Sequence, residues 1–167
     1  MNALIYLSLH MQKETTMNTI VRGAIAGIAG TVFMSVPVFA SQRLGLFASA
    51  PPVEISASVA KNIPILPSPS SAAFSVAWPV LHLAYGAAGG IIFNLIRGVL
   101  PKSTVGSGLV LGGAVWAGSY LGYLPLFHLY PAAEDDAHER TAVMLVAHAV
   151  YGVTLAFVEK ALSRGNR

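Results

Sequence analysis

Two short motifs place a histidine and a tyrosine three residues apart inside long apolar segments. The sequence reads HLAYG at residues 82–86 and HAVYG at residues 148–152. Residues three and four apart share one face of an α-helix, so each histidine should lie beside its tyrosine and glycine. Ionisable groups inside a membrane are costly and usually face the interior of a helix bundle. The repeated motif therefore predicts a pair of polar sites within the protein.

Four interpretations of His82 and His148 stay open from the sequence alone. The favoured interpretation is that both histidines, with Tyr85 and Tyr151, hydrogen-bond between helices and hold them together. A second is proton or ion handling, as in a small proton, ion or solute transporter, since imidazole titrates near neutral pH. A third is a haem ligated by the two histidines, and a fourth is a pocket for a lipid or a small apolar ligand.

Other polar and aromatic residues add to this cluster near the end of the third apolar segment. Tyr120, Tyr123 and His128 are expected at the same end of the bundle as the two histidines. The loop that follows contains Asp135 and Asp136 among other acidic residues and histidines, which could ligate a divalent ion. Capping of the last helix by one of the two aspartates explains these carboxylates more simply. No metal site is therefore predicted.

The composition identifies an integral membrane protein. Hydrophobic residues make up 54% of the 167 residues and charged residues 10%, whereas soluble domains carry about 25% charged residues. Cysteine is absent, which excludes disulfides, iron–sulfur clusters and catalytic thiols. No nucleophile elbow, phosphate-binding loop or zinc-protease motif occurs, so no catalytic residue is predicted. We expect a non-enzymatic protein without a cofactor, haem being the alternative, whose partner is the lipid bilayer and not a nucleic acid.

Four apolar segments are long enough to cross a bilayer, which takes about 20 residues. Backbone groups in lipid must be hydrogen-bonded within the segment, so each segment should be a helix. The predicted fold class is therefore an all-α transmembrane four-helix bundle, built as two hairpins. The expected spans cover residues 20–40, 73–96, 105–127 and 142–162, within a domain of residues 17–167.

Two further segments lie outside these spans. Residues 1–16 are expected to be an N-terminal extension or a short interfacial helix. Between the first two spans, PPVEISASVAKN looks like a short helix opened by two prolines. Its Ile55 and Val59 lie four residues apart, on a face that should rest on the bilayer surface.

The distribution of basic residues orients the bundle. If the N-terminus lies inside, the inside segments hold seven of the ten Lys and Arg residues and the outside segments hold three. Short cytoplasmic loops are enriched in such residues. Both termini are therefore expected in the cytoplasm. Glu159, at the inner boundary, is expected to pair with Arg97 or Arg164, or to reach water.

Glycines spaced four residues apart recur along the spans and form flat strips where helix backbones can approach closely. They predict tight packing within the bundle, and one strip is a candidate contact for a homo-oligomer or another membrane protein. The second and fourth spans also share His-x-x-Tyr-Gly and a final Arg-Gly, which indicates an internal duplication. The expected packing residues are Gly23, Gly27, Gly86, Gly90, Gly108, Gly112, Gly118, Gly122 and Gly152.

These segments resemble small bacterial inner-membrane proteins of the YagU-like type and related families of unknown function. The resemblance is carried by GAIAGIAGTVFMS, PPVEISASVAKN, HLAYGAAGGIIF and HAVYGVTLAFVE, over about residues 20–162. It implies a four-helix protein of the bacterial inner membrane, with a link to acid tolerance in some members and no assigned catalytic residue. We therefore expect a role in envelope or pH homeostasis, or as an accessory subunit.

Overall fold

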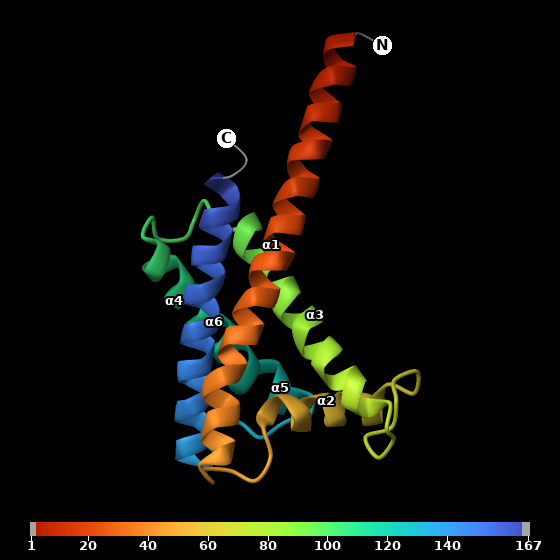
Figure 1. Ribbon diagram of the computed structural model, residues 1–167, viewed down its shortest axis with the longest axis vertical. Helices are drawn as coiled ribbons and strands as arrows, with labels where there is room; N and C mark the ends of the chain where they lie inside the picture. The colour runs from red at the N-terminus through yellow and green to blue at the C-terminus, as the bar shows by residue number, and fades with distance from the viewer. Residues whose placement is uncertain (1–2, 165–167) are drawn as a thin grey trace.

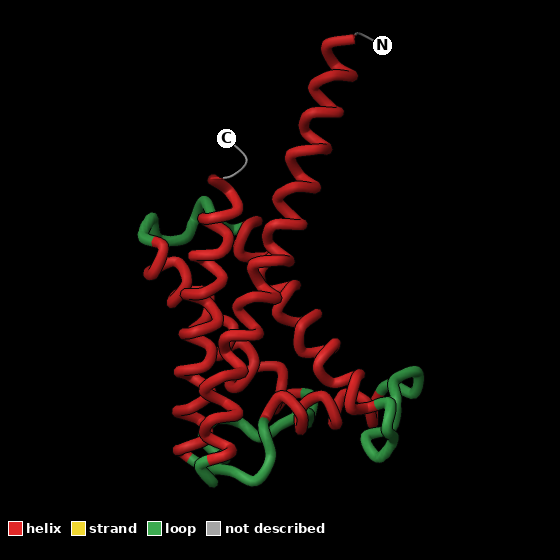
Figure 2. The backbone as a smooth tube through the Cα atoms, in the orientation of Figure 1, coloured by secondary structure: helices red, strands yellow, loops and turns green. Residues whose placement is uncertain are grey.

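The protein is built entirely from helices, turns and loops. The computed structural model describes residues 3–164, with side chains from residue 19 onward, and no strand occurs in that range (Figure 2). The elements in chain order are α1 (Ala3–Arg43), α2 (Pro51–Asn62), α3 (Phe74–Leu95), α4 (Thr104–Ala117), a π-helical turn η1 (Gly118–Tyr123), α5 (Leu124–Leu126) and α6 (His138–Arg164).

Four stretches of helix are long and apolar enough to cross a membrane. They are Thr19–Arg43, Phe74–Leu95, Thr104–Leu126 and His138–Arg164. The predicted all-α architecture with four membrane-capable helices is therefore confirmed. Residues 3–16 continue α1 as one helix, which projects well beyond the rest of the bundle (Figure 1).

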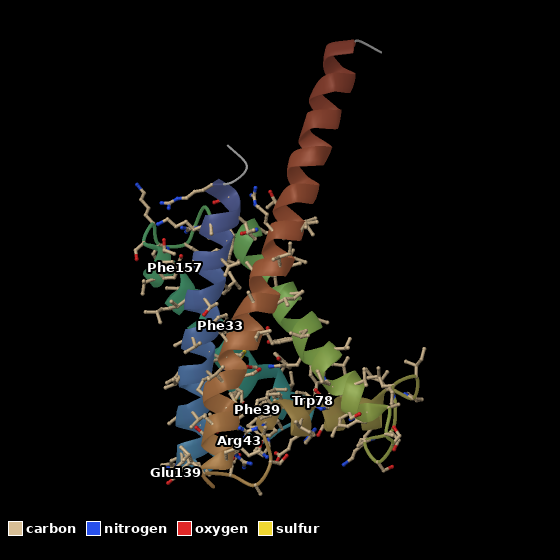
Figure 3. The ribbon with its side chains drawn as sticks, viewed as in Figure 1. Phe33, Phe39, Arg43, Trp78, Glu139 and Phe157 are labelled. Atoms are coloured by element: carbon tan, nitrogen blue, oxygen red, sulfur yellow. The ribbon has the colours of Figure 1, made fainter. Side chains whose placement is uncertain are left out.

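The four long helices pack in the order α3, α1, α6, α4. The extensive contacts are those of α1 with α3, of α1 with α6, and of α4 with α6. We call the end of the bundle where α2 lies the α2 end, and the opposite end, towards which both chain termini point, the terminal end (Figure 1). Large side chains such as Phe33 and Phe157 are 57% and 51% exposed on the sides of the bundle, where lipid chains would cover them (Figure 3).

Glycines bring the backbones of α1 and α3 into direct contact. A Cβ atom added at Gly23 would lie 2.6 Å from the carbonyl oxygen of Gly90. One turn further along α1, a Cβ atom at Gly27 would collide with the carbonyl group of Gly86. Any side chain at these positions would force the two helices apart.

The α4–α6 pair crosses in the same manner. A Cβ atom at Gly108 would lie 2.5 Å from the carbonyl oxygen of Gly152, and one at Gly112 would collide with the carbonyl oxygen of His148. Seven of the nine expected packing glycines therefore lie against the backbone of a neighbouring helix. They are Gly23, Gly27, Gly86, Gly90, Gly108, Gly112 and Gly152.

The other two expected packing glycines, Gly118 and Gly122, have a different role. An added Cβ atom at Gly118 would meet no described atom within 4 Å, and one at Gly122 would approach only the Ala117 carbonyl of its own segment. Gly122 instead has non-helical backbone angles (φ −118°, ψ −110°) inside the π-helical turn η1. The expectation of helix packing at these two positions was wrong, because the third span bends here.

The helices α1 and α3 diverge from their glycine contact towards the α2 end, and α2 lies across the opening (Figure 1). Near this end Phe39 and Trp78 bridge the two helices, with ring centroids 6.1 Å apart (Figure 3). The apolar face of α2 was expected to rest on the bilayer. Ile55 and Val59 instead face the interior of the bundle and line a cavity there. This face of α2 therefore lies against protein side chains around the cavity. The expectation that it rests on the bilayer surface was wrong.

A polar network at the α2 end ties α2 and the last loop to α6. Asp136, only 5% exposed, forms an ion pair with Arg140 and accepts hydrogen bonds from the Ala137 N–H at 2.8 Å and the Tyr130 hydroxyl at 3.2 Å. Burial, together with the nearby Asp136, raises the pKa of Tyr130, so its hydroxyl keeps the proton that it donates. Arg140 also lies 3.7 Å from Glu54 of α2. Asp136 therefore fixes Ala137, the residue before α6, and Arg140 within it. In the described structure neither aspartate accepts a hydrogen bond from a backbone N–H inside α6, so the expected cap is not what these carboxylates form.

Polar contacts also join the helices near the terminal end. The Arg22 side chain of α1 lies 3.8 Å from Glu159 of α6, and Asn94 of α3 donates a hydrogen bond of 2.8 Å to the Thr19 carbonyl. The sequence placed the partner of Glu159 at Arg97 or Arg164, and this was wrong. The central position of α1 brings Arg22 to the face of α6, which sequence spacing along α6 could not reveal.

The glycine contact leads to a stability prediction. Replacing Gly27 by alanine puts a methyl group into the Gly86 backbone, and we expect it to lower the free energy of unfolding by about 1–3 kcal/mol, as overpacking does. The matched control is Gly113→Ala in α4, where an added Cβ atom meets no described neighbour within 4 Å. Thermal unfolding in detergent, followed by circular dichroism, checks this. Equal unfolding temperatures for the two variants would contradict a packing role for Gly27.

Candidate functional site

A cavity of about 260 Å³ lies at the α2 end, where α1 and α3 diverge. Every long helix and α2 contribute to its wall. Its lining residues are Thr31 and Met34 of α1; Pro52, Ile55, Ser56 and Val59 of α2; Leu81, His82, Tyr85 and Gly86 of α3; Val115 of α4; Ser119, Tyr120 and Tyr123 of η1; Leu124 and Leu129; and Met144, His148 and Tyr151 of α6.

Six of the seven polar and aromatic residues singled out in the sequence meet at this cavity. They come from three segments that are distant in the chain and are joined by the packing of α3, η1 and α6. The six are His82, Tyr85, Tyr120, Tyr123, His148 and Tyr151. The seventh, His128, is exposed in the loop after α5, with a positive φ of 54°, and does not line this cavity.

The tyrosines of the two motifs hydrogen-bond between helices. The Tyr151 hydroxyl of α6 donates to the Gly86 carbonyl of α3 at 2.7 Å. Tyr123 of η1 donates to the Tyr85 hydroxyl of α3 at 2.8 Å, across a side of the bundle where Tyr85 is 47% exposed. For the tyrosines, the structure therefore shows the interhelical bonds that the favoured interpretation expected.

The histidines do not form such bonds. His148 Nδ1 lies 2.7 Å from the Met144 carbonyl oxygen of its own helix. None of the described residues hydrogen-bonds its Nε2 atom. His82 Nε2 is buried and also has no hydrogen-bond partner among the described residues. The expectation that both histidines link helices by hydrogen bonds was wrong, because neither imidazole has a hydrogen-bond partner on another helix in the described part of the chain.

Tyr120 provides a third buried polar group on the same wall. Its side chain is 1% exposed, and its hydroxyl has no hydrogen-bond partner in the described part of the chain. Its ring stacks on Trp116 with centroids 6.2 Å apart, and lies edge-on to Tyr130 at 5.6 Å and to His148 at 6.1 Å. These contacts fix the ring, so the hydroxyl cannot easily turn to find a partner elsewhere.

Unpartnered polar groups of this kind are unusual inside proteins. The large majority of buried polar side-chain atoms are hydrogen-bonded, and an unsatisfied one costs about 1–3 kcal/mol. Here the residues of all three atoms line one cavity, but His82 Nε2 and the Tyr120 hydroxyl have practically no accessible surface, whereas His148 Nε2 is not among these fully buried atoms. His148 Nε2 is therefore the one of the three that a molecule in the cavity can reach.

The rest of the wall is apolar and uncharged. No Lys, Arg, Asp or Glu is among the residues that line the cavity in the described structure. No three His, Asp or Glu side chains of the described residues lie close enough together to hold a metal ion. The cavity therefore offers a few hydrogen-bonding atoms in an apolar surround, which is typical of sites for small organic ligands.

Some lining residues could not be singled out from the sequence. Thr31 and Ser119 sit in the walls of the cavity and turn their hydroxyls to their own helices, at 2.9 Å from the Gly27 carbonyl and 2.7 Å from the Val115 carbonyl. The four residues that α2 contributes were also missed. The four-residue spacing of Ile55 and Val59 was the available signal, and it identified the apolar face without identifying what that face covers.

The comparisons with known proteins give a family. A model described as a family of unknown function (DUF6789) matches residues 17–167, which leaves out only the first part of α1. No match was found among curated proteins or among solved structures. The family match does not support the YagU-like type in particular, so that part of the resemblance is not carried further. From the match over residues 17–167, the chain belongs to the DUF6789 family of unknown function.

Proposed function

We propose that this chain is a non-enzymatic membrane protein that binds a small, mostly apolar molecule in the cavity at the α2 end. The single observation that carries the proposal is the cavity of about 260 Å³ between the helices, whose wall is apolar apart from a few uncharged polar side chains, His148 among them. A ligand with one polar group would hydrogen-bond to such a side chain while its apolar part filled the remaining space.

The construction of the site supports binding rather than chemistry. The cavity wall holds no acidic or basic side chain among the described residues that could activate a nucleophile beside the histidines. The tyrosines Tyr85, Tyr123 and Tyr151 are engaged in hydrogen bonds that connect helices. A ligand-binding subunit is compatible with the expected role in envelope or pH homeostasis, which stays a prediction.

We extend the proposal to the placement of the protein. Both termini lie in the cytoplasm, because seven of the ten basic residues then lie on the inside. The bacterial inner membrane is the membrane that the resemblance noted in the sequence implies. The α2 end of the bundle, with its cavity, would face the opposite side.

An internal duplication is also part of the proposal. Gly86 lies four residues after His82 and packs against Gly27 of α1. Gly152 lies four residues after His148 and packs against Gly108 of α4. Two hairpins with equivalent glycine crossings would bring their histidines to a shared space between them, which supports a common origin of the two halves.

Proton handling is a second candidate, favoured by the fact that His82 and His148 line one cavity. A proton path across the membrane needs polar groups that continue beyond the cavity. Towards the terminal end, however, the helices meet through the backbones of Gly23, Gly27, Gly86 and Gly90. Tyr151, next to this contact, already donates its proton to the Gly86 carbonyl.

Proton flux in liposomes therefore tests the second candidate. We expect the wild type and the double variant His82→Ala, His148→Ala to show the same flux as protein-free liposomes, because the glycine contact closes the cavity. The measurement is the decay of an imposed pH gradient, reported by an entrapped dye. A faster decay for the wild type alone would favour proton transport over ligand binding.

An absorbance spectrum tests the haem alternative. Sites for drug-sized ligands start at about 300 Å³, and a haem is larger than such ligands, whereas this cavity measures about 260 Å³. We expect no Soret band in protein purified from cells supplied with a haem precursor. A Soret band that disappears in His82→Ala and in His148→Ala would establish haem ligation instead.

Quenching of tryptophan fluorescence tests the proposed function directly. In a Trp78→Phe background, Trp116 is the only tryptophan, and it stacks on Tyr120 in the cavity wall. We expect 10-bromodecan-1-ol, added to protein in lipid nanodiscs, to quench Trp116 with a saturable component, because the bromine of a bound molecule comes close to the indole. Probe dissolved in the lipid adds only a linear component.

A cavity-filling variant provides the control. Val115→Phe puts a larger side chain into the cavity wall and should remove the saturable component. Val110→Phe makes the same change on the exposed side of α4 and should leave it unaltered. Quenching without saturation in the parent protein would refute ligand binding in the cavity.

A further inference from the structure

We propose that the cavity selects a neutral molecule that carries a hydroxyl group on an apolar body, such as a lipid alcohol or a phenol. This inference rests on the proposed ligand-binding function and specifies the polar group of the ligand.

The charge of the ligand follows from the wall of the cavity. No Lys or Arg side chain among the lining residues could neutralise a carboxylate or phosphate, and no Asp or Glu could neutralise an ammonium group. Moving an unpaired charge from water into apolar surroundings is very costly. The polar group of the ligand is therefore uncharged.

The hydrogen-bonding character of His148 follows from its contact with α6. A carbonyl oxygen can only accept, so His148 Nδ1, 2.7 Å from the Met144 carbonyl, carries the proton. In a neutral imidazole the other nitrogen is then an acceptor. Since Nε2 of His148 presents a lone pair to the cavity, its partner must be a donor. A ketone, an ester or an ether cannot fill this role.

The other two unpartnered atoms take no part in this contact. The Tyr120 hydroxyl and His82 Nε2 have practically no accessible surface, so a molecule in the cavity does not touch them. The ligand therefore needs one hydrogen-bond donor, for His148 Nε2. A hydroxyl group provides that donor, which a hydrocarbon or an ether does not.

The remaining surface favours a body soluble in the bilayer. Ile55, Val59, Leu81, Leu124 and Met144 line the cavity with aliphatic side chains. Tyr85 of α3 is half exposed on the side of the bundle, where it is hydrogen-bonded to Tyr123 of η1. A molecule dissolved among the lipid chains would meet the cavity from this side.

The test compares three probes of matched length in the single-tryptophan nanodisc assay. They are 10-bromodecan-1-ol, its methyl ether 1-bromo-10-methoxydecane, and 10-bromodecanoate. We expect the alcohol to bind about tenfold more tightly than the ether, a difference of about 1.4 kcal/mol, and the carboxylate to bind more weakly than both. In His148→Phe, which removes the acceptor and keeps an aromatic ring, the alcohol should lose its advantage over the ether. Tyr120→Phe should leave that advantage unchanged, because the Tyr120 hydroxyl has practically no surface accessible from the cavity.

The outcomes distinguish failure of the hydroxyl inference from failure of the proposed ligand-binding function. Saturable binding of all three probes with equal affinity would overturn the hydroxyl inference and leave the proposed function intact. Tightest binding of the carboxylate would also overturn it. Absence of saturable binding for every probe would overturn the proposed function itself. Because the three probes are compared on the unaltered cavity, the main result does not depend on whether His148→Phe folds.

Discussion

The direct contact between the backbones of α1 and α3 at Gly27 and Gly86 is the constraint on which the cavity depends. Because no side chain separates the helices there, they cross at close range and must diverge on either side of the crossing. On the α2 side the divergence opens the space that the two histidines line. A bundle with larger residues at the crossing would hold its helices more nearly parallel and would lack this space.

The open end of the bundle is closed by a helix that does not cross the membrane. The apolar face of α2 contacts the cavity, and its polar side reaches Arg140 of α6 through Glu54. Arg140 is held in turn by the buried Asp136, which accepts hydrogen bonds from Tyr130 and from the Ala137 N–H. The position of α2 over the cavity is thus set by a charged network at the surface and by apolar packing beneath it.

Much of this architecture could be predicted from the sequence, and the exceptions share a physical cause. Length and composition were sufficient for the four spans, and helical spacing was sufficient to put His82 beside Tyr85 and His148 beside Tyr151, because both depend on local rules. The bend at Gly122 and the pairing of Glu159 with Arg22 depend on how distant segments meet. Glycine spacing alone could not separate Gly118, which has no described neighbour, from Gly112, which packs on α6.

The tyrosines and the histidines of the two motifs have different places in the structure. A tyrosine hydroxyl at the end of a long ring can cross the gap between helices, and in both motifs it does so, at Gly86 and at Tyr123. The shorter imidazole, one turn earlier, has no hydrogen-bond partner on another helix among the described residues, and both histidines line the cavity. The same divergence that lets the tyrosines lock the helices therefore leaves the histidines without an interhelical bond. Ionisable groups inside a membrane usually face the interior of the bundle or a cavity, and the two histidines follow that rule without adding to the contacts between helices.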